Sequence, residues 1–286
     1  MTTNDFDASL LQQWAGKTEV LHDVLRPDAV AALAATLDYP DAPTQGEALP
    51  PLWHWIYFHA IAQQSQLGDD GHPKRGGFLP PVPLPRRMWA GGRFEFHAPA
   101  RIGELVTRTS TIHSVQAKEG ASGSLVFVTV RHDIRQGGAP VITEEHDIVY
   151  RDLPAPGAAA PAPRPAPADA RWSRTIHPDP VLLFRYSALT FNGHRIHYDR
   201  SYVTGVEGYP GLIVHGPLIA TLLVDLVRRE LPGADIARFS FRAVSPLFDT
   251  APFAVCGKPG PDGKTISLWA QNDRGELAMQ AEATLR

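Results

Sequence analysis

Apolar and polar positions alternate most clearly at the C-terminal end of the chain. The larger apolar residues of 277–285 occupy every second position, and Gln280, Glu282 and Thr284 lie between them. A period of two is typical of a half-buried antiparallel strand. Similar patterns predict strands over 238–244, 253–257 and 264–271 in the second half of the chain, and over 93–97, 105–114, 124–133 and 144–150 in the first half.

Each group of strands follows an apolar segment that predicts a helix. Pro27-Asp28 precedes AVAALAATLD in the first half, and Pro178-Asp179 precedes PVLLFRYSALT in the second. We expect each proline at the first helical position, with the aspartate in the first turn, where its charge complements the helix dipole. The repeated order predicts a duplicated α+β fold, in which two antiparallel sheets each wrap round a long helix and pair side by side.

An Ala- and Pro-rich segment separates the two halves. Residues 154–170 read PAPGAAAPAPRPAPADA, a composition that favours a semi-rigid, extended linker. We therefore predict a first domain at 1–153, a linker at 154–170 and a second domain at 171–286. A segment of the first half, 49–89, is rich in aromatic residues and prolines, and we expect it to pack as a lid or a pocket wall.

Composition and charge narrow the possible partners and compartment. The 286 residues carry a formal net charge of −3 without a basic stripe, which argues against a nucleic-acid partner. No apolar run reaches 18 residues, so no membrane span is expected. Cys256 is the only cysteine, which we interpret as a buried apolar residue, and the N-terminal segment lacks the pattern of a secretory signal. These features favour the cytoplasm.

The stretch 186–218 holds the candidate chemistry. We expect Asn192-Gly193 to end the preceding helix, with Gly193 as a left-handed cap. His194, His197 and Asp199 follow, and His215-Gly216-Pro217 opens a second apolar helix. The free amides at a helix start can bind an oxyanion, and a nearby histidine can act as a base. From composition alone, a loop with surface histidines explains this stretch equally well.

The motif TFNGHRIH at 190–197 resembles the signature of the MaoC-like, R-specific enoyl-CoA hydratase family, roughly Ser-Gly-Asp-x-Asn-Pro-Leu-His. Asn192 falls on the position of that family's catalytic Asp, and His197 on that of its catalytic His. The segments FNGHRIHYD and EGYPGLIVHGP are most similar to the double-hotdog subgroup that includes itaconyl-CoA and mesaconyl-C4-CoA hydratases, to which mitochondrial 3-hydroxyacyl thioester dehydratases are related. The resemblance implies a double hotdog fold and a hydro-lyase that acts on an acyl-CoA.

The resemblance also implies roles for individual residues. His197 would transfer the proton, and Asn192 would position water, because an amide cannot accept a proton as a carboxylate does. Asp199 or Glu207 could supply the missing carboxylate, and we interpret His194 as a structural residue or one at the edge of the substrate. The expected residues for the oxyanion and the substrate are Gly211, Val214, His215, Gly216, Arg195 and Arg87, with Arg86 and Arg185 as alternatives for a substrate carboxylate.

Several further expectations remain open at this level. The first half has LDYPD at 37–41 in place of the motif, so we interpret it as a degenerate copy that shapes the acyl pocket. His54, His59 and His72 lack a compact ligand pattern, so neither a metal nor a cofactor is expected. A short, carboxylated enoyl-CoA is the favoured substrate. The alternatives are a generic (R)-3-hydroxyacyl thioester dehydratase, an acyl-CoA thioesterase and a non-catalytic acyl-thioester-binding subunit, and a homodimer is one open assembly.

Overall fold

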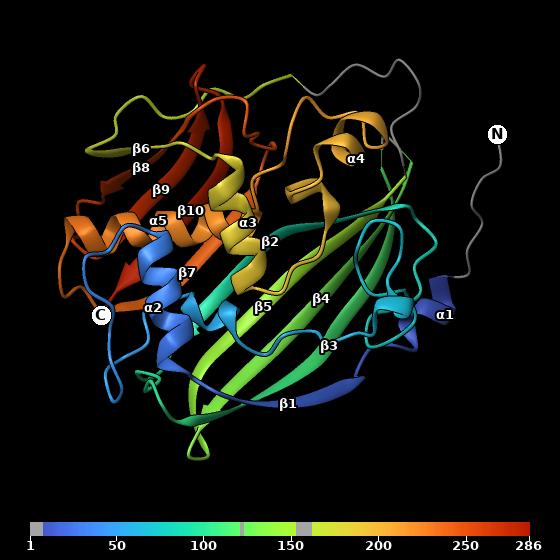
Figure 1. Ribbon diagram of the computed structural model, residues 1–286, viewed down its shortest axis with the longest axis horizontal. Coiled ribbons are helices and arrows are strands. Elements are labelled where there is room, and N and C mark those ends of the chain that lie inside the picture. Colours follow the sequence, from blue (N-terminus) through green and yellow to red (C-terminus); the bar gives the residue numbers. More distant parts are fainter. Residues whose placement is uncertain (1–7, 121–122, 153–161) are drawn as a thin grey trace.

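The computed structural model describes residues 8–120, 123–152 and 162–286 (Figure 1). Within these ranges the strands are β1 (Thr18–Val24), β2 (Arg86–Phe96), β3 (Leu105–Gly120), β4 (Gly123–Gln136), β5 (Ala139–Arg151), β6 (Trp172–Ile176), β7 (Ile236–Ala243), β8 (Phe253–Pro259), β9 (Thr265–Asn272) and β10 (Leu277–Leu285). The α-helices are α1 (Ala8–Gln12), α2 (Pro27–Thr36), α3 (Pro180–Leu189), α4 (Arg200–Gly205) and α5 (Gly216–Glu230), and the 3-10 helices are η1 (Trp53–Ile56), η2 (Gln64–Gln66) and η3 (Arg195–His197).

All of these strands form one antiparallel sheet in the order β1-β3-β4-β5-β2-β7-β10-β9-β8-β6. The two halves of the chain contribute five strands each, and they join where β2 pairs with β7, from Gly91 opposite Arg242 to Glu95 opposite Arg238. The two sheets expected from the sequence are therefore one continuous sheet. The predicted strands are all present, and several are longer than the alternation indicated. The strand β2, for example, begins at Arg86, seven residues before the predicted start at Arg93.

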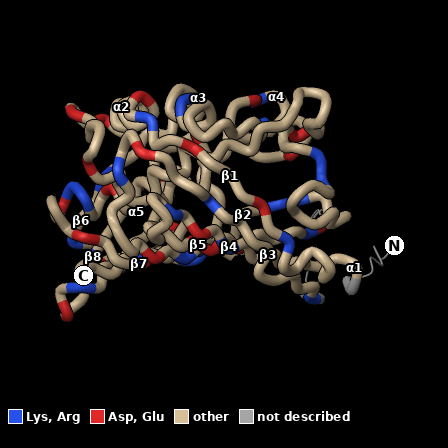
Figure 2. Tube along the Cα trace, turned by 90° about the horizontal axis from the view of Figure 1, so that it is seen from below, with Lys and Arg blue, Asp and Glu red and all other residues tan. Residues whose placement is uncertain are grey.

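Helices α2, α3 and α5 lie on the same side of this sheet (Figure 1, Figure 2). The helix α5 is the long central helix of the second half, and ten consecutive residues from Leu218 to Val227 are buried in it. In the described part of the first half no helix of that length is present. The core of the first half is filled instead by the short α2 and by buried aromatic side chains of the segment 49–89, among them Trp53 and Tyr57.

The helix α3 begins two residues later than the sequence suggested. Asp179 is the N-cap, its carboxylate accepts a hydrogen bond from the Leu182 amide at 2.8 Å, and Pro180 takes the first helical position. Both Pro178 and Pro180 fit a helix start. The helix start at Pro180 is favoured, because the Asp179 carboxylate can then accept a hydrogen bond from the Leu182 amide.

The ends of α2 and α3 reveal the duplication more clearly than the sequence does. Asp38 and Phe191 both have a left-handed backbone, with φ of 58° and 51°. The next amide, of Tyr39 or Asn192, then bonds a carbonyl five residues back, at 3.0 and 2.8 Å. The expectation that Gly193 caps α3 is therefore wrong, because Phe191 takes the left-handed position two residues earlier.

The end of the predicted linker packs on the second half of the chain. Pro165 forms a bridge with Glu276, and the Leu277 amide donates to the Arg164 carbonyl at 2.7 Å. The first part of that linker lies outside the described residues, and the division into two domains stays a prediction. Among the described helices, none is long and apolar enough to cross a membrane. Figure 2 shows basic and acidic residues interspersed along the described chain. Cys256 is buried, as expected.

Candidate active site

The motif at 192–197 forms a compact loop between α3 and α5. After α3 the chain makes the single turn η3, and Asp199 then caps α4 by accepting a hydrogen bond from the Tyr202 amide at 3.0 Å. The segment that leads into α5 returns to this loop, because the Ile213 amide donates to the Ile196 carbonyl at 3.0 Å. The structure therefore brings His197 next to the start of α5, as the sequence predicted.

His197 is held in one orientation and one tautomer. Its ring nitrogen Nδ1 lies 2.7 Å from the Ile213 carbonyl oxygen, and a carbonyl can only accept a hydrogen bond. The Nδ1 atom therefore carries the hydrogen, and Nε2 of the neutral ring keeps its lone pair. Burial lowers the pKa of His197 to about 4, so the ring is neutral at pH 7 and Nε2 is available as a base.

The ring of His215 stacks on the ring of His197. The centroids are 3.7 Å apart and the planes differ by 18°. His215 is fully buried, its Nε2 bonds the Ser187 hydroxyl at 2.8 Å, and its buried Nδ1 has no partner in the described chain. Burial holds the pKa of His215 well below its ordinary value, and the neighbouring His197 acts in the same direction. Protonation of either ring would thus place a charge in an apolar stack.

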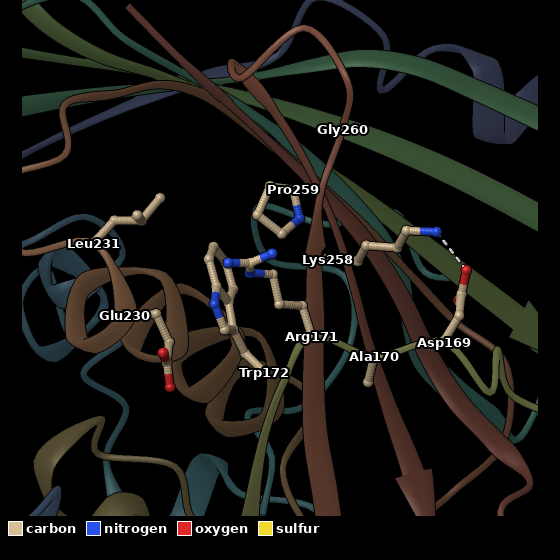
Figure 3. Close-up of a pocket in the computed structure, with 9 residues that line it drawn as sticks. All are labelled: Asp169, Ala170, Arg171, Trp172, Glu230, Leu231, Lys258, Pro259 and Gly260. Carbon is tan, nitrogen blue, oxygen red and sulfur yellow. Dashed lines mark hydrogen bonds and ion pairs between the residues drawn. The ribbon is translucent and has the colours of Figure 1, made fainter.

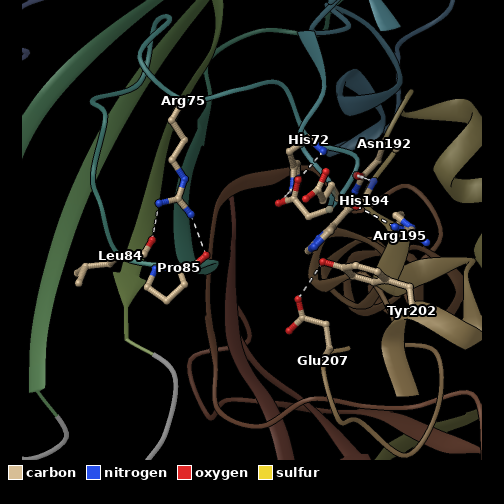
Figure 4. A network of polar contacts seen from close by, with 12 residues as sticks. His72, Arg75, Leu84, Pro85, Asn192, His194, Arg195, Tyr202 and Glu207 are labelled. Atoms are coloured by element: carbon tan, nitrogen blue, oxygen red, sulfur yellow. Dashed lines mark hydrogen bonds and ion pairs between the residues drawn. The ribbon is translucent and has the colours of Figure 1, made fainter. Parts of the chain in front are cut away.

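Asn192 directs its side-chain oxygen at its own loop. Its Oδ1 accepts a hydrogen bond from the His194 amide at 3.0 Å (Figure 4). This closes a short turn that fixes the start of the motif. The side-chain NH₂ group is then the part of Asn192 that remains to donate to another molecule.

A loop of the first half packs directly on the motif. A Cβ atom on Gly71 would lie 2.0 Å from the Gly193 carbonyl oxygen, so the two backbones touch and only glycine fits there. Arg195 fastens the same contact, because its amide donates to the Asp70 carbonyl at 2.9 Å and its Nη1 to the Asp69 carbonyl at 3.0 Å. The other guanidinium contacts of Arg195 are with Asp199 and the face of the Tyr202 ring.

Two residues of this loop add chemistry that the sequence did not point to. Asp70 Oδ2 lies 3.1 Å from His72 Nδ1, and the ring of His72 lies 4.1 Å from that of His194, between centroids. Figure 4 shows His72 and His194 side by side, although they are far apart in the sequence. No local pattern marked Asp70, because its relation to the motif exists only after the two halves have packed.

Asp70, His72 and His194 place one possible ligand atom each within 4.8 Å of one another, which is the only such metal-ligand group among the described residues. Three ligands with an open position is the pattern of a catalytic zinc site. In this group, however, the Asp70 carboxylate is already hydrogen-bonded to His72 Nδ1. If that bond is kept, two nitrogen ligands remain, so we do not assign a metal to these residues.

Of the three arginines considered for a substrate carboxylate, Arg87 is the one whose charge acts on His72 and His194. It is half-buried on β2, donates a hydrogen bond to the Tyr150 hydroxyl, and its charge helps to lower the pKa values of His72 and His194. Arg86 lies 3.9 Å from the Glu207 carboxylate and over the Tyr209 ring. Arg185 is exposed on α3. Within the described chain, Arg87 has no carboxylate partner.

The expected oxyanion donors differ in availability. The Val214 amide donates to the Leu247 carbonyl at 2.9 Å and is therefore occupied. Gly211 is tightly packed, since a Cβ atom there would lie 2.6 Å from Asp249 Oδ1. The Gly216 amide is at the first position of α5, where it has no acceptor within the helix, and a Cβ atom on Gly216 would meet nothing within 4 Å. Of this set, the Gly216 amide is the one that opens α5 and faces the positive end of the helix dipole.

The corresponding position of the first half is filled. Tyr39, which matches Asn192 in the capping pattern, donates its hydroxyl hydrogen to the Asp225 carboxylate on α5. Arg174 and Arg229 bond the same buried carboxylate at 2.6 and 2.8 Å, and the Arg229 guanidinium lies over the Tyr39 ring. A tyrosine and a closed ion network therefore replace the polar loop.

A surface hollow near the end of α5, lined by residues that include Trp172 and Lys258, contains none of the predicted site residues (Figure 3).

The fold and the histidine loop together define a double-hotdog protein. A MaoC-like dehydratase structure superposes with a TM-score of 0.67 at 15% identity, over 95% of this chain and 98% of the other. A Mycobacterium tuberculosis protein described as a double hotdog superposes with a TM-score of 0.59 at 14% identity, over 95% and 96%. The α+β double hotdog fold is therefore confirmed.

Sequence comparison gives the family. The profile of hydroxyacyl-thioester dehydratase type 2 matches residues 52–249. The mesaconyl-C4-CoA hydratase of Chloroflexus aurantiacus is 51% identical over 273 residues, which are 95% of this chain and 96% of that protein. The chain belongs to the hydroxyacyl-thioester dehydratase type 2 family, and it is an enzyme of the hydro-lyase class.

The Gly71 contact predicts a selective effect of a single methyl group. Gly71→Ala should lower kcat/KM at least tenfold, because the new Cβ must push the loop away from Gly193. The matched control is Gly76→Ala. Gly76 also has a positive φ, of 94° against 87°, but its Cβ would meet only a Pro81 carbon at 3.8 Å. Steady-state kinetics of both variants test this, and equal losses would show that backbone strain alone is responsible.

The buried state of His197 predicts a pH dependence of stability. The pKa of His197 is about 4 in the folded protein against about 6.5 in an unfolded chain. Between these values the unfolded state binds more protons, so this contribution to stability is present above about pH 6.5 and is lost as the pH falls toward 4. Urea midpoints at pH 7 and pH 5 should differ less in His197→Gln than in the unaltered protein. The exposed His22, changed to Gln, is the control that should keep the full difference.

Proposed function

We propose that the protein catalyses the reversible addition of water to a short enoyl-CoA thioester that carries a free carboxylate, of the mesaconyl-C4-CoA type. The observation that carries this proposal is the neutral, oriented Nε2 of His197 at the start of α5, in a chain 51% identical to a mesaconyl-C4-CoA hydratase over nearly its whole length. Arg87, a half-buried cation beside the histidines, supports a carboxylated substrate.

The chain's own residues divide the work of hydration. The Gly216 amide, at the positive end of α5, would donate to the thioester oxygen and stabilise the enolate that forms when water attacks. His197 Nε2 would accept a proton from that water. The NH₂ group of Asn192 would donate to the water oxygen and hold it at the β-carbon. In this scheme Asn192 positions the water and His197 transfers the proton.

Other predicted residues have supporting parts in the same proposal. The stacked His215 restricts the plane in which His197 can lie. Gly211 and Val214 shape the segment that leads into α5, through close packing and a backbone bond. Arg195, with its contacts to the loop at 69–70, is proposed to fix the motif rather than to bind the CoA phosphates. A cytoplasmic location fits a single, buried cysteine. We also propose a homodimer, and the mass measured by sedimentation tests this assembly.

The central test is turnover of mesaconyl-C4-CoA, followed as loss of the enoyl absorbance. The unaltered enzyme should hydrate it, and His197→Ala should lower kcat about 100-fold or more while the protein stays folded. Asn192→Asp should keep activity, and Asn192→Ala should lose it. Release of free CoA thiol without hydration would indicate a thioesterase, and binding without either reaction would indicate a non-catalytic subunit.

Arg87 predicts the selectivity for a carboxylate. Arg87→Ala should lower kcat/KM for itaconyl- or mesaconyl-type thioesters about 100-fold, because a desolvated carboxylate would lose its cation. The same variant should change kcat/KM for uncharged crotonyl-CoA by less than threefold. Arg185→Ala, on the exposed side of α3, is the matched control. Equal effects on both kinds of substrate would contradict a carboxylate contact.

A further inference from the structure

In the proposed scheme Asn192 only donates to the water, so His197 is its single acceptor, and the other candidates for an acceptor are engaged elsewhere. Asn192 uses its side-chain oxygen within its own loop. Asp199 accepts hydrogen bonds from Arg195, Ser201 and the Tyr202 amide. Glu207 lies between Arg86 and the Tyr202 hydroxyl. None of the three has a described contact with His197.

Asp70 and His72 form an oriented pair at the same place. The two oxygens of Asp70 bind one residue twice, because Oδ1 accepts from the His72 amide at 3.0 Å and Oδ2 from the ring Nδ1 at 3.1 Å. A carboxylate accepts the Nδ1 hydrogen, so Nε2 of the neutral His72 ring carries the lone pair. This is the relation of carboxylate to histidine that fixes the base in a catalytic triad.

The pair is directed at the motif and is held there rigidly. The His72 ring is 4.1 Å from His194, and the His194 ring is 5.5 Å from His197, between centroids. The backbone contact of Gly71, the residue between Asp70 and His72, with Gly193 fixes this distance. The titratable and charged groups that face His72 are Asp70, Arg75, Arg87, His194 and His197.

We propose that His72, oriented by Asp70, is a second catalytic residue of the hydration: with His197 it accepts a hydrogen bond from the attacking water, to which the Asn192 NH₂ group donates. This inference rests on the proposed function. One O–H bond of water breaks as its oxygen bonds to the β-carbon, and the π electrons move toward the α-carbon and the thioester oxygen. His197 Nε2 takes the proton and returns it to the α-carbon. The atoms of one water are therefore added, and nothing else is consumed.

The arrangement also explains how the chain works without the carboxylate that its motif lacks. Asp70 comes from the other half of the chain and acts through His72, so Asp70 is a positioning residue. In this proposal the segment 49–89 supplies a reacting group, His72, in addition to the wall of a pocket.

The test compares His72→Gln and Asp70→Asn with the unaltered enzyme on the same enoyl-CoA. His72→Gln should lower kcat about 100-fold with KM within threefold. Asp70→Asn should lower kcat about tenfold and move the acid limb of the kcat/KM profile to lower pH, because His72 loses the carboxylate that favours its protonated form. A purely structural role of Asp70 would not move that limb. His22→Gln, on the edge strand β1, is the control for a histidine outside the site.

Each outcome decides between stated alternatives. If His72→Gln keeps kcat within threefold while His197→Ala is inactive, the role of His72 is refuted and the proposed function stands. If the unaltered enzyme hydrates no enoyl-CoA, the proposed function fails and this inference with it. If His72→Gln does not fold, Asp70→Asn decides by its kcat and its pH profile. Activity that EDTA abolishes and Zn²⁺ restores would show a metal at these residues and overturn the paired base.

Discussion

The antiparallel pairing of β2 with β7 is the constraint on which the site depends. It joins the two halves into one sheet, and it fixes the segment that precedes β2 relative to the helices of the second half. The loop at 69–72 belongs to that segment and meets the motif through a backbone contact, which side-chain rotation cannot relax. The histidines are thus assembled from parts of the chain more than a hundred residues apart, and a shift in the strand register would separate them.

Burial gives the site its electrostatic character. His194, His197 and His215 all have lowered pKa values, because the protonated rings would be poorly solvated. Four neighbouring imidazoles, with His72, therefore create a polar surface that carries little positive charge of its own. Arg87 adds a fixed charge to this surface, and an anionic group there would interact with it more strongly than in water, because the neighbouring histidines are largely buried.

The sequence predicted the local elements well and the long-range contacts poorly. Period-two alternation located eight of the ten described strands, since it depends only on which face of the sheet is buried, and it missed the edge strands β1 and β6. Helix ends were less secure: two prolines competed for the start of α3, and Phe191 rather than Gly193 took the left-handed position. The sequence could place His197 near the start of α5 because its motif is contiguous. It could not place Asp70 beside His72 and His194, because that contact requires the tertiary packing of the two halves.

The filled position around Tyr39 has a consequence for stoichiometry. Two separate hotdog subunits related by symmetry would present the same polar loop twice, once at each end of their shared helix layer. Here the second place is occupied by the Tyr39 ring, and burial beside Asp225 raises the pKa of its phenol to about 12, so that it remains a neutral donor at any physiological pH. One chain would then bind a single ligand, and saturation should follow a simple hyperbola without interaction between sites within the chain.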